Sequence, residues 1–557
     1  MLAPDLILLN GKIATMEGGR VVEALAARDG RIAALGDSDE IRALAGPESE
    51  IHDLRGARAI PGIVESHAHP DSYAARIASW ENVGPERIAT REALLDRIAA
   101  LAAVRAPGEW IACHRFNDMK QGGYPTLEQM DRAAGETPLF IQRTDGHIGL
   151  ANTAAFRALD LWPDPADPPF GMFDRDPDGR LTGLARETAA HAFRSHVHAA
   201  DTPESVADGL ERVFDDWLSV GITTVYNSLT GRVGIDAYQR LRAESRLWMR
   251  VGIIVSGREE GLVEAFIRAG VRSGFGDDWL RVIGVEWCPD CSTSGRTAAY
   301  YEPYEGQPVI GEPTPNTGML LYEPDDLRRR AVAAHRAGLQ VMIEGVGDRG
   351  IDFALDAIEA CLEAEPRDDH RMRVEHCCYV TPPILERLKR LGAVASSATG
   401  FMYSLGDAYR ANRGADAMRR MWPHRSMIDA GVPAPGHSDA MICEANPFPA
   451  MWSMIARRSD TGGDLCAAEA VTREEALQAY TTLGAWSGRE ERDKGSLAVG
   501  KLADIAVLDR DFFTIPQNEI RDVGVTMTIV GGRVMHARSP SGRMEDRRRR
   551  PSERAPV

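Results

Sequence analysis

Two histidines separated by one residue stand at the end of a short apolar run near the amino terminus. The run Ala59-Ile60-Pro61-Gly62-Ile63-Val64-Glu65-Ser66 leads into His67-Ala68-His69. Its apolar side chains predict a buried strand, and because the side chains of a strand alternate between its faces, His67 and His69 should point the same way. Two imidazoles side by side are half of a transition-metal site. The carboxyl ends of strands are also where parallel α/β barrels carry their chemistry.

Alternating strand and helix signals supply the elements that would position such a site. Eight strand candidates are separated by helical stretches such as 325–337 and 351–364, an alternation that is typical of a (β/α)8 TIM barrel. The candidates are residues 60–69, 221–226, 250–255, 280–286, 339–344, 371–376, 392–396 and 432–439.

The segments outside this alternation predict three further parts. Short strands and turns occur at both ends of the chain, and each set is too small for a core of its own. We therefore expect residues 1–58 and 490–537 to form one composite β-sandwich, and residues 59–71 and 216–489 to form the barrel. Residues 72–215 are too many for a crossover and predict a large insertion, with helices of its own, that covers the active site. Residues 538–557, rich in Arg, Pro and Ser, predict a disordered tail.

Composition and charge exclude several classes of partner. The chain has 557 residues and a net charge of −17, which argues against nucleic acid or an anionic membrane as a partner. No apolar run approaches the roughly 18–20 residues of a membrane span, and no basic segment followed by an apolar one opens the sequence. The eight cysteines are scattered rather than arranged as a disulfide framework, which favours a reducing cytoplasm. The expected partner is a small-molecule substrate, and the expected assembly is a homodimer.

Several motifs, taken in order, resemble those of the amidohydrolase superfamily. The run that ends in His67-Ala68-His69 resembles its first-strand motif, and residues 495–504 resemble its return into a β-sandwich. More narrowly, the chain is similar to the large-insertion branch that includes N-substituted formamide deformylases. The matching pieces are Asp145-Gly146-His147 with Ala151-Asn152, Gly221-Ile222-Thr223-Thr224-Val225, Arg296-Thr297-Ala298 before Glu302-Pro303-Tyr304, Gly347-Asp348, Arg373-Val374-Glu375-His376 and Ser438-Asp439.

This resemblance implies a metal site at the carboxyl ends of the barrel strands. His67, His69, His376 and Asp439 match the ligand positions of the family directly. Two further positions depart from the pattern: Glu286 stands where the branch has a carboxylated lysine that bridges two metals, and Glu344 stands where it has the fifth-strand histidine. The expected ligand set is therefore His67, His69, Glu286, Glu344, His376 and Asp439.

The two substitutions, Glu286 for lysine and Glu344 for histidine, have different chemical consequences. A carboxylated lysine also presents a carboxylate, so Glu286 is a mild change. Glu344 replaces a neutral nitrogen ligand by an anionic oxygen, which leaves a less positive site and favours harder ions. We expect one or two divalent ions per chain, with zinc first and manganese or iron as the alternatives. A single-metal site, in which Glu344 acts as a general base or hydrogen-bond acceptor, stays open.

The reaction that the resemblance implies is hydrolysis of a C–N bond other than a peptide bond, in a small amide with an apolar substituent. A metal-bound hydroxide would attack the carbonyl carbon, Asp439 would transfer its proton to the leaving nitrogen, and His147 would hold the developing oxyanion. Two alternatives stay open. One is a lyase, decarboxylase or isomerase on the same metal barrel, and the reason to consider it is the pair of altered ligands, Glu286 and Glu344. A non-catalytic metal-binding relative is the other, although the intact His-x-His pair and Asp439 count against it.

Overall fold

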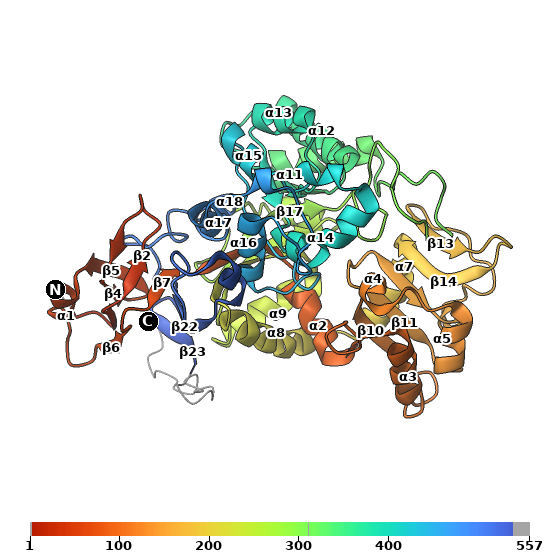
Figure 1. Ribbon diagram of the computed structural model, residues 1–557, viewed down its shortest axis with the longest axis horizontal. Helices are drawn as coiled ribbons and strands as arrows, with labels where there is room; N and C mark the ends of the chain where they lie inside the picture. The colour runs from red at the N-terminus through yellow and green to blue at the C-terminus, as the bar shows by residue number, and fades with distance from the viewer. Residues whose placement is uncertain (1–2, 310, 539–557) are drawn as a thin grey trace.

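Seven parallel strands form the central sheet of the computed structural model, which describes residues 3–309 and 311–538. They neighbour one another in the order β20-β19-β18-β17-β16-β15-β8 and curve into a TIM-like barrel in the middle of the molecule (Figure 1). The strands are β8 (Ile63–Ala68), β15 (Ile222–Thr230), β16 (Arg250–Ser256), β17 (Leu280–Trp287), β18 (Gln340–Gly345), β19 (Arg373–His376) and β20 (Val394–Ser397). Each lies within one of the predicted ranges or overlaps it closely.

The first predicted strand, residues 60–69, is wrong in one respect, because it divides at Gly62. Residues before the glycine form β7 (Arg58–Pro61), which joins a different sheet, and residues after it form β8 of the barrel. A Cβ atom at Gly62 would lie 2.2 Å from Thr223 Oγ1 in the neighbouring strand. The close approach of the two strands therefore requires glycine at the point where the chain leaves one sheet for the other.

The predicted eighth strand, residues 432–439, is not a regular strand, although the segment occupies the expected place. Pro433 and Pro435 cannot donate ladder hydrogen bonds, and a single bridge between Ser397 and Gly436 is formed. The carbonyl oxygens of both prolines accept hydrogen bonds from β20. On the other side, the Asp439 amide donates to the His67 carbonyl oxygen over 3.2 Å. The segment thus bridges β20 and β8 and carries Asp439 to the mouth of the barrel.

Helices on the outside of the barrel connect successive strands. They are α9 (Arg232–Ala243), α10 (Leu262–Arg268), α11 (Pro324–Arg336), α12 (Asp348–Ala364), α13 (Pro382–Leu391) and α14 (Thr399–Arg413), followed after the last strand by α15 (His424–Ala430), α16 (Pro447–Ala456), α17 (Arg473–Ala479) and α18 (Thr482–Ser487). Inside the barrel, one apolar side chain from each of five neighbouring strands enters a common buried cluster with Ala485 of α18. These side chains are Val64, Tyr226, Ile254, Ile283 and Met342. The interior is therefore a packed core below the site rather than a channel.

Strands from both ends of the chain make two further sheets at one end of the molecule (Figure 1). One sheet has the order β5-β4-β1-β6 and the other β23-β22-β21-β7-β2-β3. The strands are β1 (Leu6–Leu9), β2 (Lys12–Ala14), β3 (Val21–Val22), β4 (Ala24–Arg28), β5 (Arg31–Gly36), β6 (Glu50–Asp53), β21 (Ile505–Leu508), β22 (Val525–Val530) and β23 (Arg533–Ala537), with the short helix α1 (Ser38–Arg42). Leu8, Leu25, Ile505 and Ile529 belong to one buried cluster, so the two ends of the chain share a core.

The segment after β8 contains a sheet that the sequence did not predict. Its six strands have the order β13-β14-β12-β11-β10-β9 and lie at the end of the molecule opposite the chain termini (Figure 1). They are β9 (Glu81–Asn82), β10 (Ile111–Phe116), β11 (Leu139–Arg143), β12 (Ile148–Ala151), β13 (Gly171–Arg175) and β14 (Leu181–Glu187), accompanied by α3 (Arg91–Ala102), α4 (Asp118–Gln121), α5 (Leu127–Ala134), α6 (Thr153–Ala158) and α7 (Thr188–His198).

Two helices flank this sheet in the sequence and pack against each other. They are α2 (Pro70–Ser79) and α8 (Pro203–Leu218). A Cβ atom at Gly209 would lie 2.5 Å from the carbonyl oxygen of Ala74, so a glycine is needed for the helices to approach this closely. The division of the chain into domains by residue number stays a prediction.

Three smaller expectations concern the whole chain. All eight cysteines are free. Within the described residues, every helix is too short or too polar to cross a membrane. Apart from Arg538, the predicted disordered tail lies outside the described residues.

Candidate metal centre

The two histidines of the first motif lie at the carboxyl end of the barrel, where β8 ends and α2 begins. His67 Nδ1 lies 2.8 Å from Glu375 Oε2, and His69 Nδ1 lies 3.0 Å from the carbonyl oxygen of Ser228. Burial raises the pKa of Glu375, but Arg373 and His67 more than offset this and hold it well below its ordinary value. Both oxygens therefore accept, each Nδ1 carries a proton, and each Nε2 is left to bind a further partner. This arrangement orients imidazoles in metal sites.

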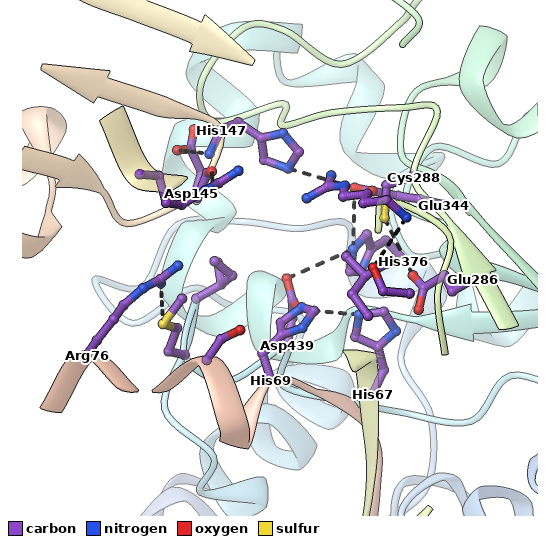
Figure 2. A pocket seen from close by; sticks show the side chains of 18 of the residues that line it. His67, His69, Arg76, Asp145, His147, Glu286, Cys288, Glu344, His376 and Asp439 are labelled. Atoms are coloured by element: carbon purple, nitrogen blue, oxygen red, sulfur yellow. Dashed lines mark hydrogen bonds and ion pairs between the residues drawn. The ribbon is translucent and has the colours of Figure 1, made fainter. Parts of the chain in front are cut away.

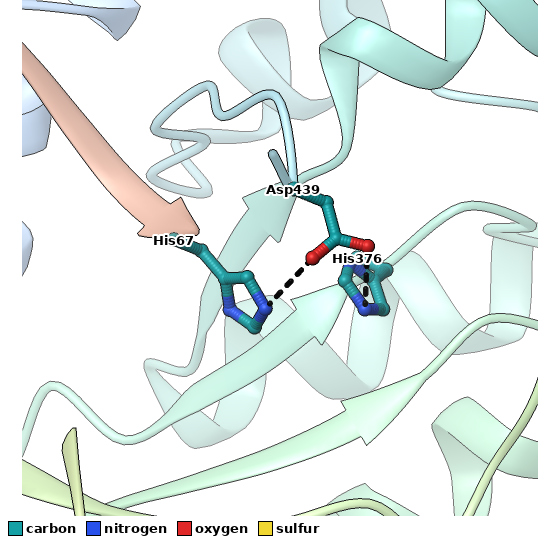
Figure 3. Close-up of side chains that lie close together, drawn as sticks. All are labelled: His67, His376 and Asp439. Carbon is teal, nitrogen blue, oxygen red and sulfur yellow. Dashed lines mark ion pairs between the residues drawn. The ribbon is translucent and has the colours of Figure 1, made fainter. Parts of the chain in front are cut away.

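Asp439 and His376 reach the same point from the other side of the barrel (Figure 3). Asp439 Oδ1 lies 3.0 Å from His69 Nε2 and 3.4 Å from His67 Nε2, and Oδ2 lies 3.9 Å from His376 Nε2. Ligand atoms about 2.0–2.2 Å from one tetrahedral ion are about 3.3–3.6 Å apart. The separations from Asp439 are close to these values, and the ligand atoms of His67, His376 and Asp439 all lie within 4.8 Å of one another. These three side chains therefore fit a single divalent ion, with His69 beside Asp439.

Backbone geometry and charge support the same assignment. His376 and Asp439 have φ angles of 66° and 55°, in the left-handed region that residues other than glycine seldom adopt. Such strain collects at functional sites. Burial lowers the pKa of His67, but Glu286, Asp439 and Glu375 more than offset this and raise it well above its ordinary value. The cluster thus has an excess of negative charge that a divalent cation would balance.

Glu286 and Glu344 line the same pocket, on neighbouring strands. Glu344 Oε1 lies 3.5 Å from His376 Nε2, and burial raises the pKa of Glu344 to about 8. Glu286 accepts a short hydrogen bond from the Ser228 hydroxyl, and burial raises its pKa as well. Buried carboxylates held at raised pKa values are candidates for metal binding or proton transfer. Their role as ligands stays a prediction.

His147 lies across the pocket from His67 and comes from the sheet of the inserted segment (Figure 2). It precedes β12, whose pairing with β14 places it beside Glu187, and the Glu187 amide donates to the His147 carbonyl oxygen over 2.9 Å. His147 Nδ1 lies 2.8 Å from Glu187 Oε2, and Nε2 lies 3.9 Å from Glu344 Oε1. Burial lowers the pKa of His147, but Glu187 more than offsets this and raises it to about 9. Near neutral pH His147 is therefore a cation with one N–H directed into the pocket.

The structure thus brings all seven predicted site residues to one pocket. It is lined by His67, His69, His147, Glu286, Glu344, His376 and Asp439, together with residues of the inserted segment, and contains about 860 Å³ of empty space that is partly open to solvent. Figure 2 shows the two strand-end histidines at the bottom of the view and the Asp145–His147 loop above them.

Several neighbours of the site have no motif in the sequence that assigns them a role. Glu375 and Ser228 orient the histidines, as described above. His437 stacks on the His67 ring at a centroid separation of 4.8 Å, and both of its ring nitrogens are buried without a hydrogen-bond partner among the described residues. Burial lowers its pKa well below the ordinary value, so the ring is neutral. The one signal in the sequence is its position two residues before Asp439.

Comparison with known proteins places the chain in a family. The model of the Amidohydrolase family matches residues 50–536, so the chain belongs to this family. It is 27% identical to the N-substituted formamide deformylase of Arthrobacter pascens over 96% of this chain and 99% of that protein. It is 24% identical to the putative amidohydrolase YtcJ of Bacillus subtilis (strain 168), over 95% of this chain and 99% of that one. The fold resembles that of an uncharacterized metal-dependent hydrolase from Pyrococcus horikoshii OT3 (TM-score 0.73, 23% identity, 92% and 99% of the two chains). The protein is a metal-dependent hydrolase with the TIM-like barrel of its family.

Proposed function

We propose that the protein hydrolyses an amide-type C–N bond, other than a peptide bond, in a small molecule. The observation that carries the proposal is the convergence of His67, His69, His376 and Asp439 on one point, with Asp439 Oδ1 3.0 and 3.4 Å from two imidazole nitrogens. Similarity to an N-substituted formamide deformylase supports an amide rather than an ester or phosphate as the substrate.

The residues around the site have distinct roles in this reaction. His67, His69, His376 and Asp439 would hold a divalent ion, which supplies Lewis acidity for activating water and polarising a carbonyl group. Burial raises the pKa of Asp439, but His376, His67 and His69 more than offset this and hold it well below the ordinary value, so the group is ionised. It can accept the proton of the attacking water and deliver it to the leaving nitrogen.

His147 completes the site from the opposite wall. Its cationic ring directs an N–H at the pocket, where it can stabilise negative charge that develops on the carbonyl oxygen. Glu187 keeps the ring protonated and oriented, because it binds Nδ1 over 2.8 Å. Glu187 is therefore a positioning residue, and His147 is the group that would touch the substrate.

Glu286 and Glu344 are proposed as additional ligands that make the site richer in oxygen than a purely imidazole site. Glu344 Oε1 lies 3.5 Å from His376 Nε2, and Glu286 acts electrostatically on His67. Zinc is the expected ion, and the added carboxylates make manganese or iron the alternatives. Whether the site holds one ion or two depends on whether Glu286 bridges.

The experiment that tests the proposal uses the full chain, purified and depleted of metal with a chelator. It is reconstituted with zinc, manganese or iron and assayed for amine release from a panel of N-substituted formamides and acetamides, with metal content measured alongside. We expect about one or two ions per chain and turnover that depends on them. A protein that binds no divalent ion tightly, or one that binds it and releases no amine from any amide, would refute the proposal.

A further inference from the structure

Three arginine side chains line the same pocket as the proposed metal ligands. They are Arg76 of α2, Arg194 of α7 and Arg258, which follows β16. Figure 2 shows Arg76 at one side of the pocket and Glu286 and Glu344 at the other, with Asp439 and His69 between. Within residues 3–309 and 311–538, none of the three forms an ion pair with a carboxylate.

Arg76 is the most informative of the three, because it is only 6% exposed. Its Nε atom is buried and has no hydrogen-bond partner in the described part of the chain. Its Nη1 atom contacts the thioether sulfur of Met441, a weak acceptor, and its guanidinium carbon lies 5.4 Å from the ring centroid of Trp80. A buried guanidinium with no anionic partner is costly, so a partner from outside the chain is expected.

Glu344 and Glu187 act electrostatically on Arg258, whereas the carboxylates that act on Arg76 and Arg194 are bound to other groups. Asp71 accepts from the Ser72 amide over 2.7 Å, Asp201 Oδ2 lies 2.6 Å from His198 Nδ1, and Glu187 holds His147. Arg194 donates to the carbonyl oxygen of Gly146 over 2.8 Å, which leaves its charge unbalanced. A chain with a net charge of −17 has thus placed two arginines, Arg76 and Arg194, at one cavity without an ion pair to a carboxylate in the described residues.

The arginines also act on one another. Burial and the charge of Arg194 lower the pKa of Arg76 to about 9, and burial and the charge of Arg258 lower that of Arg194 to about 10. Like charges held this close repel, and an anion between them would remove the repulsion and supply acceptors for their N–H groups. An arginine that merely supported the fold would be expected to pair with one of the carboxylates nearby.

We propose that Arg76 and Arg194 form a subsite for an oxyanion such as a carboxylate, with Arg258 lining the same pocket. The substrate would then be an amide that carries a negatively charged group at a distance from the scissile bond, rather than the apolar substituent that the sequence predicts. This proposal rests on the proposed function for the reaction, but the binding it predicts does not require turnover. A guanidinium can bind a carboxylate through two parallel hydrogen bonds, which gives both orientation and affinity.

The test compares substrates that differ in charge alone. N-formylphenylalanine and N-acetylphenylalanine are each compared with the corresponding primary amide, in which the carboxylate is neutral. For the wild type, kcat/KM should be higher for the carboxylate member of each pair. In Arg76→Met the ratio of the two kcat/KM values should fall by about 10- to 150-fold, the loss expected for a charged hydrogen-bonding partner. Arg76→Lys keeps the charge but loses the two parallel N–H groups of the guanidinium, so its ratio of kcat/KM values should lie between those of the wild type and Arg76→Met.

Matched controls separate this effect from a general loss of structure. Arg132→Met removes an arginine of α5 that pairs with Glu128 on the surface, and the ratio should not change. Circular dichroism, thermal unfolding and metal content establish that each variant is folded and loaded. If Arg76→Met fails to fold, Arg194→Met at a half-buried position carries the same test.

Binding measured by calorimetry on the metal-free protein separates the two proposals. Carboxylate-dependent binding that Arg76→Met or Arg194→Met abolishes, without turnover of any amide, would support the anion subsite and refute the proposed reaction. Equal binding and equal kcat/KM for the charged and neutral members, with efficient hydrolysis of both, would overturn the subsite and leave the reaction standing. Folded arginine variants with an unchanged preference for the carboxylate would overturn it as well.

Discussion

Replacing Glu187 by glutamine should shift the alkaline limb of the pH–activity profile to lower pH. Glu187 Oε2 lies 2.8 Å from His147 Nδ1. Burial lowers the pKa of His147, but Glu187 first, with Glu344 and Asp145, more than offsets this and raises it to about 9. Without that carboxylate charge, the pKa should return towards the ordinary value of about 6.5. A change of about 2.5 units corresponds to about 3 kcal/mol of interaction between the two side chains.

The loss of activity follows from the fraction of His147 that is protonated. At pH 8, a group with a pKa of about 9 is about nine-tenths protonated, whereas one with a pKa of about 6.5 is about one-thirtieth protonated. If the cationic ring stabilises the developing oxyanion, kcat/KM should fall about 30-fold at pH 8 but only by about a tenth at pH 5.5, where both forms of the ring are almost fully protonated. The assay is kcat/KM between pH 5.5 and 10 for the wild type, Glu187→Gln and the surface control Glu128→Gln.

Stability offers a second readout that needs no substrate. The raised pKa of His147 contributes to the free energy of unfolding. This contribution is fully present below the pKa of the unfolded state, about 6.5, and is lost as the pH rises through the pKa of the folded state, about 9. The difference in free energy of unfolding between the wild type and Glu187→Gln should therefore be largest below pH 6.5, shrink between pH 6.5 and about 9, and be small above that. Alkaline limbs that coincide, together with a stability difference independent of pH, would show that Glu187 does not set the charge of His147.

Three further predictions concern the metal ligands. His67→Ala should reduce bound metal and turnover to background and leave the unfolding temperature of the metal-free protein within a few degrees of the wild-type value, since other side chains pack the barrel; normal metal content by elemental analysis would remove His67 from the ligand set. Asp439→Asn should retain most of the metal, because the amide keeps an oxygen ligand, yet lose about 10²–10⁴-fold in kcat because it cannot accept the proton; near-normal kcat would exclude the proton-transfer role. Glu344→His should raise the preference for zinc over manganese and shift the acidic limb of the pH–rate profile to lower pH, because the site regains a positive charge. If competitive metal loading and the acidic limb are both unchanged, Glu344 lies outside the ligand set.

The barrel could be predicted because its signal is local and repeated. Each strand is a short apolar run, each is followed by a helical stretch, and the polar residues His67, Glu286, Glu344 and His376 come at or next to the ends of those runs. Parallel strands carry their carboxyl ends to one side, so the sequence alone brings these side chains to the same face. The irregularity of the eighth segment, residues 432–439, could not be predicted in this way. Pro433 and Pro435 prevent a regular hydrogen-bond ladder, although the segment still lies between β20 and β8.

The inserted sheet could not be predicted from local signals, because its strands pair across long stretches of chain. Strand β12 pairs with β14, some thirty-five residues further on, and that register alone sets Glu187 beside His147. No motif connects these residues in the sequence, and nothing local distinguishes Arg76 or Arg194 from the other arginines of surface helices. Burial distinguishes Arg76 and Arg194 from those other arginines. An arginine on an exposed helix is surrounded by water, whereas these two lie against the cavity without an anionic partner in the described residues.

The pocket combines side chains from the barrel with side chains from the inserted segment, and the two groups have different proposed roles. The barrel carries the proposed metal ligands, and strand geometry fixes their positions relative to one another. The inserted segment supplies His147, Arg76 and Arg194, which face the ligands across the cavity. Loops and insertions vary more readily than a packed barrel, so relatives that keep the ligands can differ in the charge of this wall. The resemblance to a formamide deformylase therefore bears on the bond that is cleaved, whereas the arginines bear on what the rest of the substrate carries.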